Sequence, residues 1–260
     1  MLFERKMDLN TNIRRNQLEE IIKNRKEVDI SELNNMFDVS SVTIRNDLIA
    51  LERKNVIKRT FGKVYFRDDS FQYPHNSVPI KNIAEKERIA KYAATLINPD
   101  DSVLFYTGST TLQIIRYIDP AIQFVAVTNS IWIAQELRIL PNVKTIFIGG
   151  NFNHQIGATY GLEAISQIQK YNIDKLFLAV DGIDSEVGIT NRLSFENDLN
   201  HIMLAQCKEC IVVADYSKVG QLSFVKMGDI TEIDILITDS KASEEQVNKI
   251  RQKGVAVVVT

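Results

Sequence analysis

The first 66 residues have a hydrophobic pattern that predicts three short amphipathic helices and a β-hairpin. Residues 12–27 and 31–37 each place apolar side chains at helical spacing among charged ones, and a third helix follows Ser40. Ser31 is expected to cap the second helix and Ser40 the third. The expected inward-facing residues are Leu18, Ile21, Ile22, Leu33, Met36, Phe37, Ile44, Leu48 and Leu51.

The spacing of these elements is typical of a winged helix-turn-helix. Only a short break at residues 38–39 separates the second and third helices, which is the helix-turn-helix spacing. Residues 56–66 then form two β-type runs joined at a glycine, which predicts a hairpin wing. We therefore expect a DNA-binding domain over residues 1–67.

The outward side of the third helix carries groups that can bind double-stranded DNA. Arg45 can bond guanine through two donors, and Asn46 can bond adenine in the same way. Hydroxyl groups near the helix start and cations on the wing can bind phosphates. The alternative is structural: the hydroxyls only cap the helix and Arg45 is solvated. The candidate DNA-binding residues are Ser41, Thr43, Arg45, Asn46, Lys58, Arg59 and Lys63.

From residue 82 onward, apolar runs alternate with helical patterns. The runs are continuous, which indicates strands covered on both faces and hence a mainly parallel α/β sheet. Ligands bind such sheets beyond the carboxyl ends of the strands, near the point where strand order reverses. We expect an α/β effector-binding domain over residues 82–260, a linker at 68–81, and strands at 102–106, 122–127, 143–148, 175–180, 210–214, 233–238 and 255–259.

Polar residues follow five successive predicted strands, and one group of them predicts a phosphate site. Gly108, Ser109, Thr110 and Thr111 form a glycine turn into a helix, which offers N–H groups and hydroxyls to a phosphate, although simple capping is the alternative. Lys218 would supply a counter-charge, and carboxylates would bond sugar hydroxyls. The ligand expected is a phosphorylated sugar or sugar alcohol. The other candidate effector-binding residues are Thr128, Asn129, Ser130, Gly149, Gly150, Asp181, Gly182 and Glu196.

Charge and composition favour one class of partner and exclude another. The chain has a net charge of −2, yet residues 1–67 hold fourteen basic against ten acidic residues, a net of +4. This favours a polyanion as the partner of that half only, although chance scatter gives similar differences. Because there is no run of eighteen apolar residues and no apolar signal-peptide centre, we expect a cytoplasmic protein without a membrane partner.

The sequence indicates no metal or cofactor. Cys207 and Cys210 have the spacing of a redox motif, but they span a predicted helix end and strand start and have no second pair for zinc. The three histidines are scattered along the chain. We therefore expect neither a metal site nor a cofactor.

Both halves resemble the DeoR family of bacterial sugar-metabolism regulators. The first half matches in Ser40–Leu48, Leu51-Glu52 and Lys58–Gly62, but has Asn46 where the family usually has a second Arg and residues 61–63 in place of a His-Gly-Gly wing tip. The second half matches in Glu85-Lys86, Ile89-Ala90, Gly108–Thr111, Val127–Ser130, Gly149-Gly150, Asp181–Ile183, Gly188, Glu196, Ala214-Asp215 and Ser217-Lys218.

In the second half the departures lie near the sugar end of the expected pocket. Tyr106-Thr107 stands where relatives often have Asp, and Asn197 and Asn200 stand where they have Ala and Lys. The resemblance implies a sugar-phosphate-isomerase-like fold and a homo-oligomeric repressor, a dimer or tetramer. It also implies that a phosphorylated sugar releases this repressor from operator DNA.

Two functions follow from the sequence. The first is a transcriptional repressor of a sugar or sugar-alcohol utilisation operon. The second is a sugar-phosphate isomerase-type enzyme with an appended DNA-binding head, in which Asp181, Asp184, Glu196 and Lys218 would move protons between sugar carbons. The repressor is favoured for two reasons. The chain carries a DNA-binding head, and the polar residues of the expected pocket include no clearly paired acid and base.

Overall fold

The structure is a computed structural model that describes residues 11–25, 27–37, 39–53, 56–60, 62–66, 81–192 and 197–260. The chain forms two compact units, Met1–Gln72 and Tyr73–Thr260. Of the expected linker at 68–81, only Lys81 is among the described residues. The exact domain boundaries therefore stay predictions.

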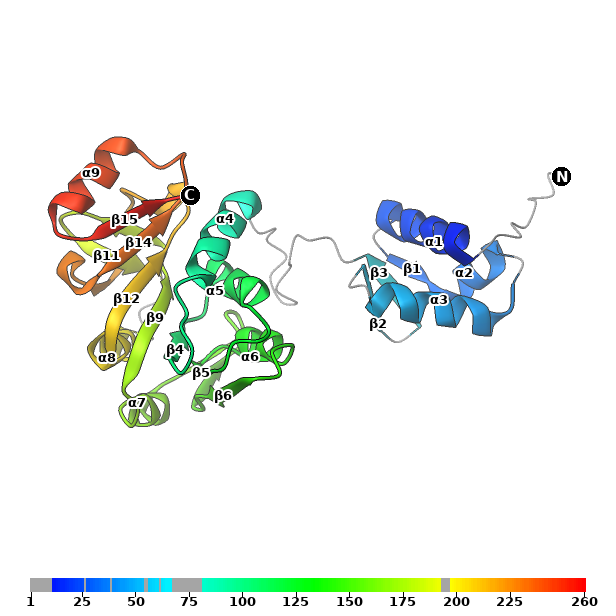
Figure 1. Cartoon of the computed structure of the whole chain (residues 1–260), viewed down its shortest axis with the longest axis horizontal. Coiled ribbons are helices and arrows are strands. Elements are labelled where there is room, and N and C mark those ends of the chain that lie inside the picture. Colours follow the sequence, from blue (N-terminus) through cyan, green and yellow to red (C-terminus); the bar gives the residue numbers. More distant parts are fainter. Residues whose placement is uncertain are drawn as a thin grey trace. The chain divides into compact units, whose positions relative to one another are not determined.

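The first unit is a winged helix-turn-helix, as predicted (Figure 1). Its three antiparallel strands have the order β1-β3-β2, and its helices share a core that includes Leu18, Ile44 and Leu48, all fully buried. The strand that joins the predicted hairpin, β1, was not predicted because it is only three residues long. The elements are α1 (Thr11–Arg25), β1 (Glu27–Asp29), α2 (Ile30–Met36), α3 (Ser41–Arg53), β2 (Ile57–Thr60) and β3 (Lys63–Phe66).

One of the two predicted caps is confirmed and the other is wrong. The Ser40 hydroxyl accepts a hydrogen bond of 3.1 Å from the backbone N–H of Thr43, which caps α3. Ser31 lies inside α2, which begins at Ile30. The start of α2 is instead fixed by the wing, because the N–H of Ile30 donates to the carbonyl of Gly62 at 2.9 Å.

The second unit is built on a seven-stranded sheet in which every neighbouring pair is parallel. Its order is β15-β14-β12-β9-β4-β5-β6. All seven apolar runs became strands of this sheet, so the predicted α/β class is confirmed. The strands are β4 (Ser102–Phe105), β5 (Phe124–Thr128), β6 (Val143–Phe147), β9 (Ile173–Ala179), β12 (Cys207–Val213), β14 (Ile235–Thr238) and β15 (Ala256–Val259).

Helices cover both faces of the sheet (Figure 1). Helices α4, α5 and α6 pack beside one another, and α7 packs against α8, which also contacts β9 and β12. None of the helices in the described residues is long and apolar enough to cross a membrane. The helices are α4 (Ile83–Ala94), α5 (Ser109–Ile114), α6 (Ile131–Leu137), α7 (Leu162–Ile168), α8 (Asn197–Gln206) and α9 (Glu244–Gln252), with short 3-10 turns η1 (Ile115–Tyr117), η2 (Tyr216–Lys218) and η3 (Ile230–Glu232).

Strand order reverses between β4 and β9. The chain runs outward from β4 through β5 to β6, and later returns to β9 on the other side of β4 before continuing through β12. The residues that follow β4 and β9 therefore lie at a topological switch point. Two small antiparallel groups lie outside the main sheet: β7 (Asn151–Asn153) with β8 (Ala158–Tyr160), and β10 (Gly182–Asp184) with β11 (Gly188–Asn191) and β13 (Val225–Gly228).

Candidate functional site

Helix α3 presents an exposed polar row that begins at its N-terminus. Ser41, Arg45 and Asn46 are exposed, as predicted. Thr43 is half-buried, and its hydroxyl lies 2.9 Å from the Ser40 hydroxyl, so it contributes to the cap. Val42, which sequence reasoning overlooked, is 65% exposed and could meet a thymine methyl group. The sequence could have indicated this exposure, because Val42 does not lie on the inward-facing side of the helix.

A groove runs between α2, α3 and the wing. It brings together Arg45 of α3 and Arg59 of β2, with Leu48 at its base and Gly62 of the wing turn at its rim. Both arginines were predicted DNA-binding residues from different elements. The groove therefore combines a group suited to base edges with a group suited to phosphates.

The wing cations are not simply free charges. Glu52 of α3 binds the Nε and Nη2 groups of Arg59 at 2.9 and 2.7 Å and accepts its backbone N–H at 3.0 Å. Lys63 pairs with Glu27 of β1, and this hydrogen bond raises the pKa of Lys63. The side chain of Lys58 lies outside the described part of the chain. Arg59 is thus held in a fixed direction by α3, which sequence spacing did not indicate.

The second unit has a cavity of about 260 Å³ at the switch point. It lies where β4, β9 and β12 end, which is where the sequence placed the ligand. The predicted residues Gly108, Ser109, Thr110, Asp181 and Lys218 line it. Tyr106 and Thr107, expected near the sugar end of the pocket, line it too. The other lining residues were not candidate effector-binding residues, although some lie in the segments that match the family: Lys86, Ile156, Ala179, Val180, Asn191, Val213, Ala214 and Asp215.

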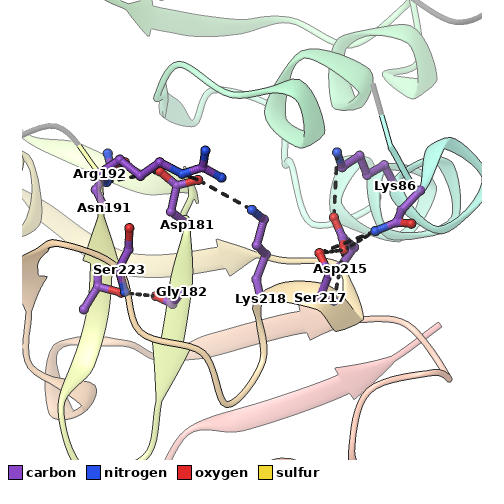
Figure 2. A network of polar contacts seen from close by, with 11 residues as sticks. Lys86, Asp181, Gly182, Asn191, Arg192, Asp215, Ser217, Lys218 and Ser223 are labelled. Carbon is purple, nitrogen blue, oxygen red and sulfur yellow. Dashed lines mark hydrogen bonds and ion pairs between the residues drawn. The ribbon is translucent and has the colours of Figure 1, made fainter. Parts of the chain in front are cut away.

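The charged groups of the cavity form two ion pairs (Figure 2). The Nζ of Lys218 lies 3.5 Å from Oδ1 of Asp181, which also lies 3.6 Å from Nε of Arg192. The Nζ of Lys86 lies 3.7 Å from Oδ2 of Asp215. All three distances exceed the usual 2.7–2.9 Å of a short charged hydrogen bond, so both ammonium groups keep donor capacity for an anion.

Burial makes Lys86 the more unusual of the two lysines. Its side chain is 10% exposed and that of Asp215 is 2% exposed. Burial lowers the pKa of Lys86, Asp215 opposes this shift, and the positive charge of Lys218 lowers the pKa further. An anion bound between the two lysines would relieve this repulsion.

Gly108 is required for packing at the end of β9. A Cβ atom at this position would lie 2.3 Å from the Cβ of Ala179 at the end of β9, which is sterically impossible without a shift. Thr111 has a structural role too, because its hydroxyl donates to the carbonyls of Tyr106 and Gly108 at 2.7 and 2.9 Å. Thr111 does not line the cavity.

The predicted residues at the ends of β5 and β6 form hydrogen bonds with neighbouring elements instead. The Asn129 amide donates to the carbonyl of Thr159 at 2.8 Å, and Thr128 donates to Phe105 at 2.8 Å. Gly149 donates its N–H to Gln167 at 3.1 Å. The structure does not bring Thr128, Asn129, Ser130, Gly149, Gly150 or Gly182 into the cavity wall. Glu196 lies outside the described residues.

The arrangement suits binding more than catalysis. The cavity offers two cations, two carboxylates and hydroxyl groups around a small space, with each lysine beside a carboxylate. Within the described residues, no cluster of three or more His, Cys, Asp or Glu side chains could hold a metal.

Asn200, which stands where relatives have Lys, is buried, and neither polar atom of its amide has a hydrogen-bond partner in the part of the chain that the structure describes.

Comparison with known proteins places both units in one family. Residues 14–69 match the DeoR-like helix-turn-helix domain, and residues 81–240 match the DeoR C terminal sensor domain. A putative aga operon transcriptional repressor from Escherichia coli O157:H7 is 33% identical over 252 residues, which cover 96% of this chain and 94% of that protein. The transcriptional repressor GlcR from Bacillus subtilis (strain 168) is 29% identical over 242 residues, or 93% of each protein.

The likeness to solved structures is more distant. The full-length sorbitol operon regulator SorC from Klebsiella pneumoniae has 10% sequence identity and a TM-score of 0.41, and the match covers 94% of this chain and 100% of that one. The repressor relative, by contrast, is 33% identical over 96% of this chain, and the two family matches cover residues 14–69 and 81–240. The protein therefore belongs to the DeoR family, as a helix-turn-helix transcriptional regulator with a DeoR C-terminal sensor domain.

Proposed function

We propose that this protein represses a sugar or sugar-alcohol utilisation operon and is released from its operator by a phosphorylated sugar metabolite. The observation that carries the proposal is the combination of an exposed Arg45 and Asn46 on α3 with a two-lysine cavity in the sensor unit. The relatives named for the aga operon and as the repressor GlcR support repression of this class of operon. The isomerase alternative is set aside because the family consists of transcription regulators and not of enzymes.

The proposed division of roles follows the two units. Arg45, Asn46 and Ser41 contact bases or nearby phosphates, while Arg59 and the wing lysines hold the DNA backbone. In the cavity, Lys86 and Lys218 bind the phosphate, and Asp181 with Asn191 bonds sugar hydroxyls. The protein acts as a homo-oligomer, because paired half-sites on DNA require paired heads.

Release requires that the ligand bind the two functional states unequally. A preference of roughly 1–3 kcal/mol for the form that does not bind DNA lowers operator affinity about 5–150-fold. A ligand that binds both states equally changes nothing, however tight it is. The ligand must therefore change the sensor unit at a place that is connected to the DNA-binding unit.

The proposal is tested in two steps on the full-length protein. A thermal-shift screen compares phosphorylated sugars and sugar alcohols with the same compounds lacking phosphate, since only a ligand of the folded state raises the melting temperature. Each compound that shifts it is then added to an operator complex, with the operator selected from random duplexes. A phosphorylated compound should both stabilise the protein and weaken the complex. If no compound of a broad panel does so, the sensor function is wrong.

A further inference from the structure

Helix α4 contributes a wall residue to the cavity and is also anchored to the other side of the same cavity. Lys86 of α4 lines the cavity. One turn earlier, Nδ2 of Asn82 donates to Oδ1 of Asp215 at 2.8 Å. Asp215 is the N-cap residue of η2, which ends at Lys218. The two lysines of the cavity therefore come from two elements, α4 and η2, that meet at one carboxylate (Figure 2).

The start of α4 depends on this contact. Asn82 is the N-cap residue of α4, but its side chain makes no capping hydrogen bond to the helix. Its amide bonds Asp215 instead, and its backbone has a φ of 58°, a left-handed conformation that asparagine tolerates better than most residues. The N-cap residue of α4 is thus bonded to the cavity wall, so a change at Asp215 reaches the start of α4 directly.

The two lysines of α4 and η2 take part only in long ion pairs. Lys86 is 3.7 Å from Asp215, and Lys218 turns to Asp181 at 3.5 Å. An anion with several acceptor oxygens can accept from both ammonium groups at normal hydrogen-bond distance. Such an anion would join α4 to η2 by strong charged hydrogen bonds in place of two long ion pairs.

We propose that the phosphate of the ligand bridges Lys86 of α4 and Lys218 of η2, and that this bridge fixes the first turn of α4. The inference rests on the proposed function, because it takes this cavity as the site of a phosphorylated ligand. Helix α4 follows residue 81, the end of the predicted linker to the DNA-binding unit. Ligand binding in the cavity therefore orders the start of α4, which directly follows the predicted linker between the two units.

The test uses the full-length protein with inorganic phosphate as the probe, at an ionic strength held constant with chloride. Two quantities are measured: the melting temperature of the sensor unit, and amide hydrogen exchange in peptides that cover residues 82–94. Phosphate should raise the melting temperature and slow exchange in the first turn of α4 by about threefold or more. The backbone N–H of Lys86, which donates to the carbonyl of Asn82 at 3.0 Å, is the most direct reporter.

Three variants make the test specific. Lys86→Met keeps the length of the side chain but removes its charge, and should lose both effects of phosphate. Lys86→Arg keeps the charge and should retain a large part of both. Lys91→Met is the matched control, because Lys91 lies on the same helix with its Nζ over the Tyr117 ring and is not part of the cavity wall. It should respond to phosphate as the wild type does.

The outcomes separate this inference from the proposed function. A rise in melting temperature without slower exchange in α4 overturns the bridge but leaves the anion site standing. Slower exchange that persists in Lys86→Met overturns the role of Lys86. If phosphate changes neither quantity in the wild type, both the bridge and the phosphate site are wrong.

Discussion

Asp47 of α3 accepts a hydrogen bond of 2.6 Å from Nε of Arg14 in α1, and both side chains are buried. The second carboxylate oxygen of Asp47 accepts from Nε of Arg15 at 2.7 Å. One carboxylate on the recognition helix thus holds two consecutive cations of another helix. Asp47 directly follows Asn46, so the placement of the predicted base-contacting residues depends on this buried charge cluster.

Replacing Asp47 by Asn should destabilise the first unit. Removing one partner of a buried ion pair leaves an uncompensated charge, and we expect a loss of roughly 3 kcal/mol in its free energy of unfolding. Scanning calorimetry of the full-length protein measures this, with the sensor unit as an internal reference. Asp29→Asn, at an exposed position of β1, is the control and should have little effect. Unfolding of Asp47→Asn at the wild-type temperature would contradict the structural role.

Arg45 and Lys63 should affect DNA binding in different ways. Arg45→Ala should reduce the preference for the operator over altered sequences by about 1–3 kcal/mol, because a base-reading contact is lost. Lys63→Ala should weaken binding to all duplexes similarly and reduce the salt dependence, because only a phosphate contact is lost. Anisotropy titrations with operator and scrambled DNA at several salt concentrations distinguish the two. Equal losses on both DNAs for Arg45→Ala would mean that Arg45 reads no base.

Gly108→Ala should destabilise the sensor unit, and Ala179→Gly should restore part of the lost stability. The added methyl group would meet the Cβ of Ala179 at 2.3 Å, and overpacking of this kind costs about 1–3 kcal/mol. Ala179→Gly removes the opposing atom, so the double variant should be more stable than Gly108→Ala alone. Urea unfolding followed through the sensor unit tests this. A double variant no more stable than Gly108→Ala would show that the clash is not with Ala179.

Ligand affinity should fall with rising pH because of Lys86. Burial holds the pKa of Lys86 below its ordinary value of 10.5. The protonated form binds the anion, so affinity is complete below the lowered pKa and is lost as the pH rises through it. Calorimetric titration of a ligand from the screen between pH 7 and 10 measures the decline. Lys86→Arg stays charged over this range and should keep its affinity longer; an identical decline in that variant would exclude Lys86 as the cause.

The fold could be predicted well from the sequence because its signals are local. Uninterrupted apolar runs identified all seven strands of the parallel sheet, and the i, i+4, i+7 spacing of Ile44, Leu48 and Leu51 identified the buried side of α3. Strand β1 escaped because three residues carry too short a pattern. The start of α2 escaped because it is set by Gly62, which lies about thirty positions further along the chain and is brought there only by folding.

The site was predicted only in part, for a related reason. Residues that follow β4, β9 and β12 could be found because strand ends in a parallel sheet share one edge. Lys86 was part of a family match, but its role in the cavity could not be predicted, because it lies on a helix before the first strand of the sheet and reaches the cavity only through the packing of α4. Conversely, Asn129 and Gly149 also follow strands, yet hydrogen bonds to the β8 strand and to α7 occupy them.

The bond between Ile30 and Gly62 has a consequence for the choice of operator. It ties the wing turn to α2, while Glu52 ties β2 to α3, so the wing is attached to both helices of the helix-turn-helix. Because these bonds limit independent movement of α3 and the wing, the DNA groove must have a width that matches their spacing. We therefore expect operator strength to depend on the stiffness of base pairs between the helix and wing contacts, including positions that no side chain touches.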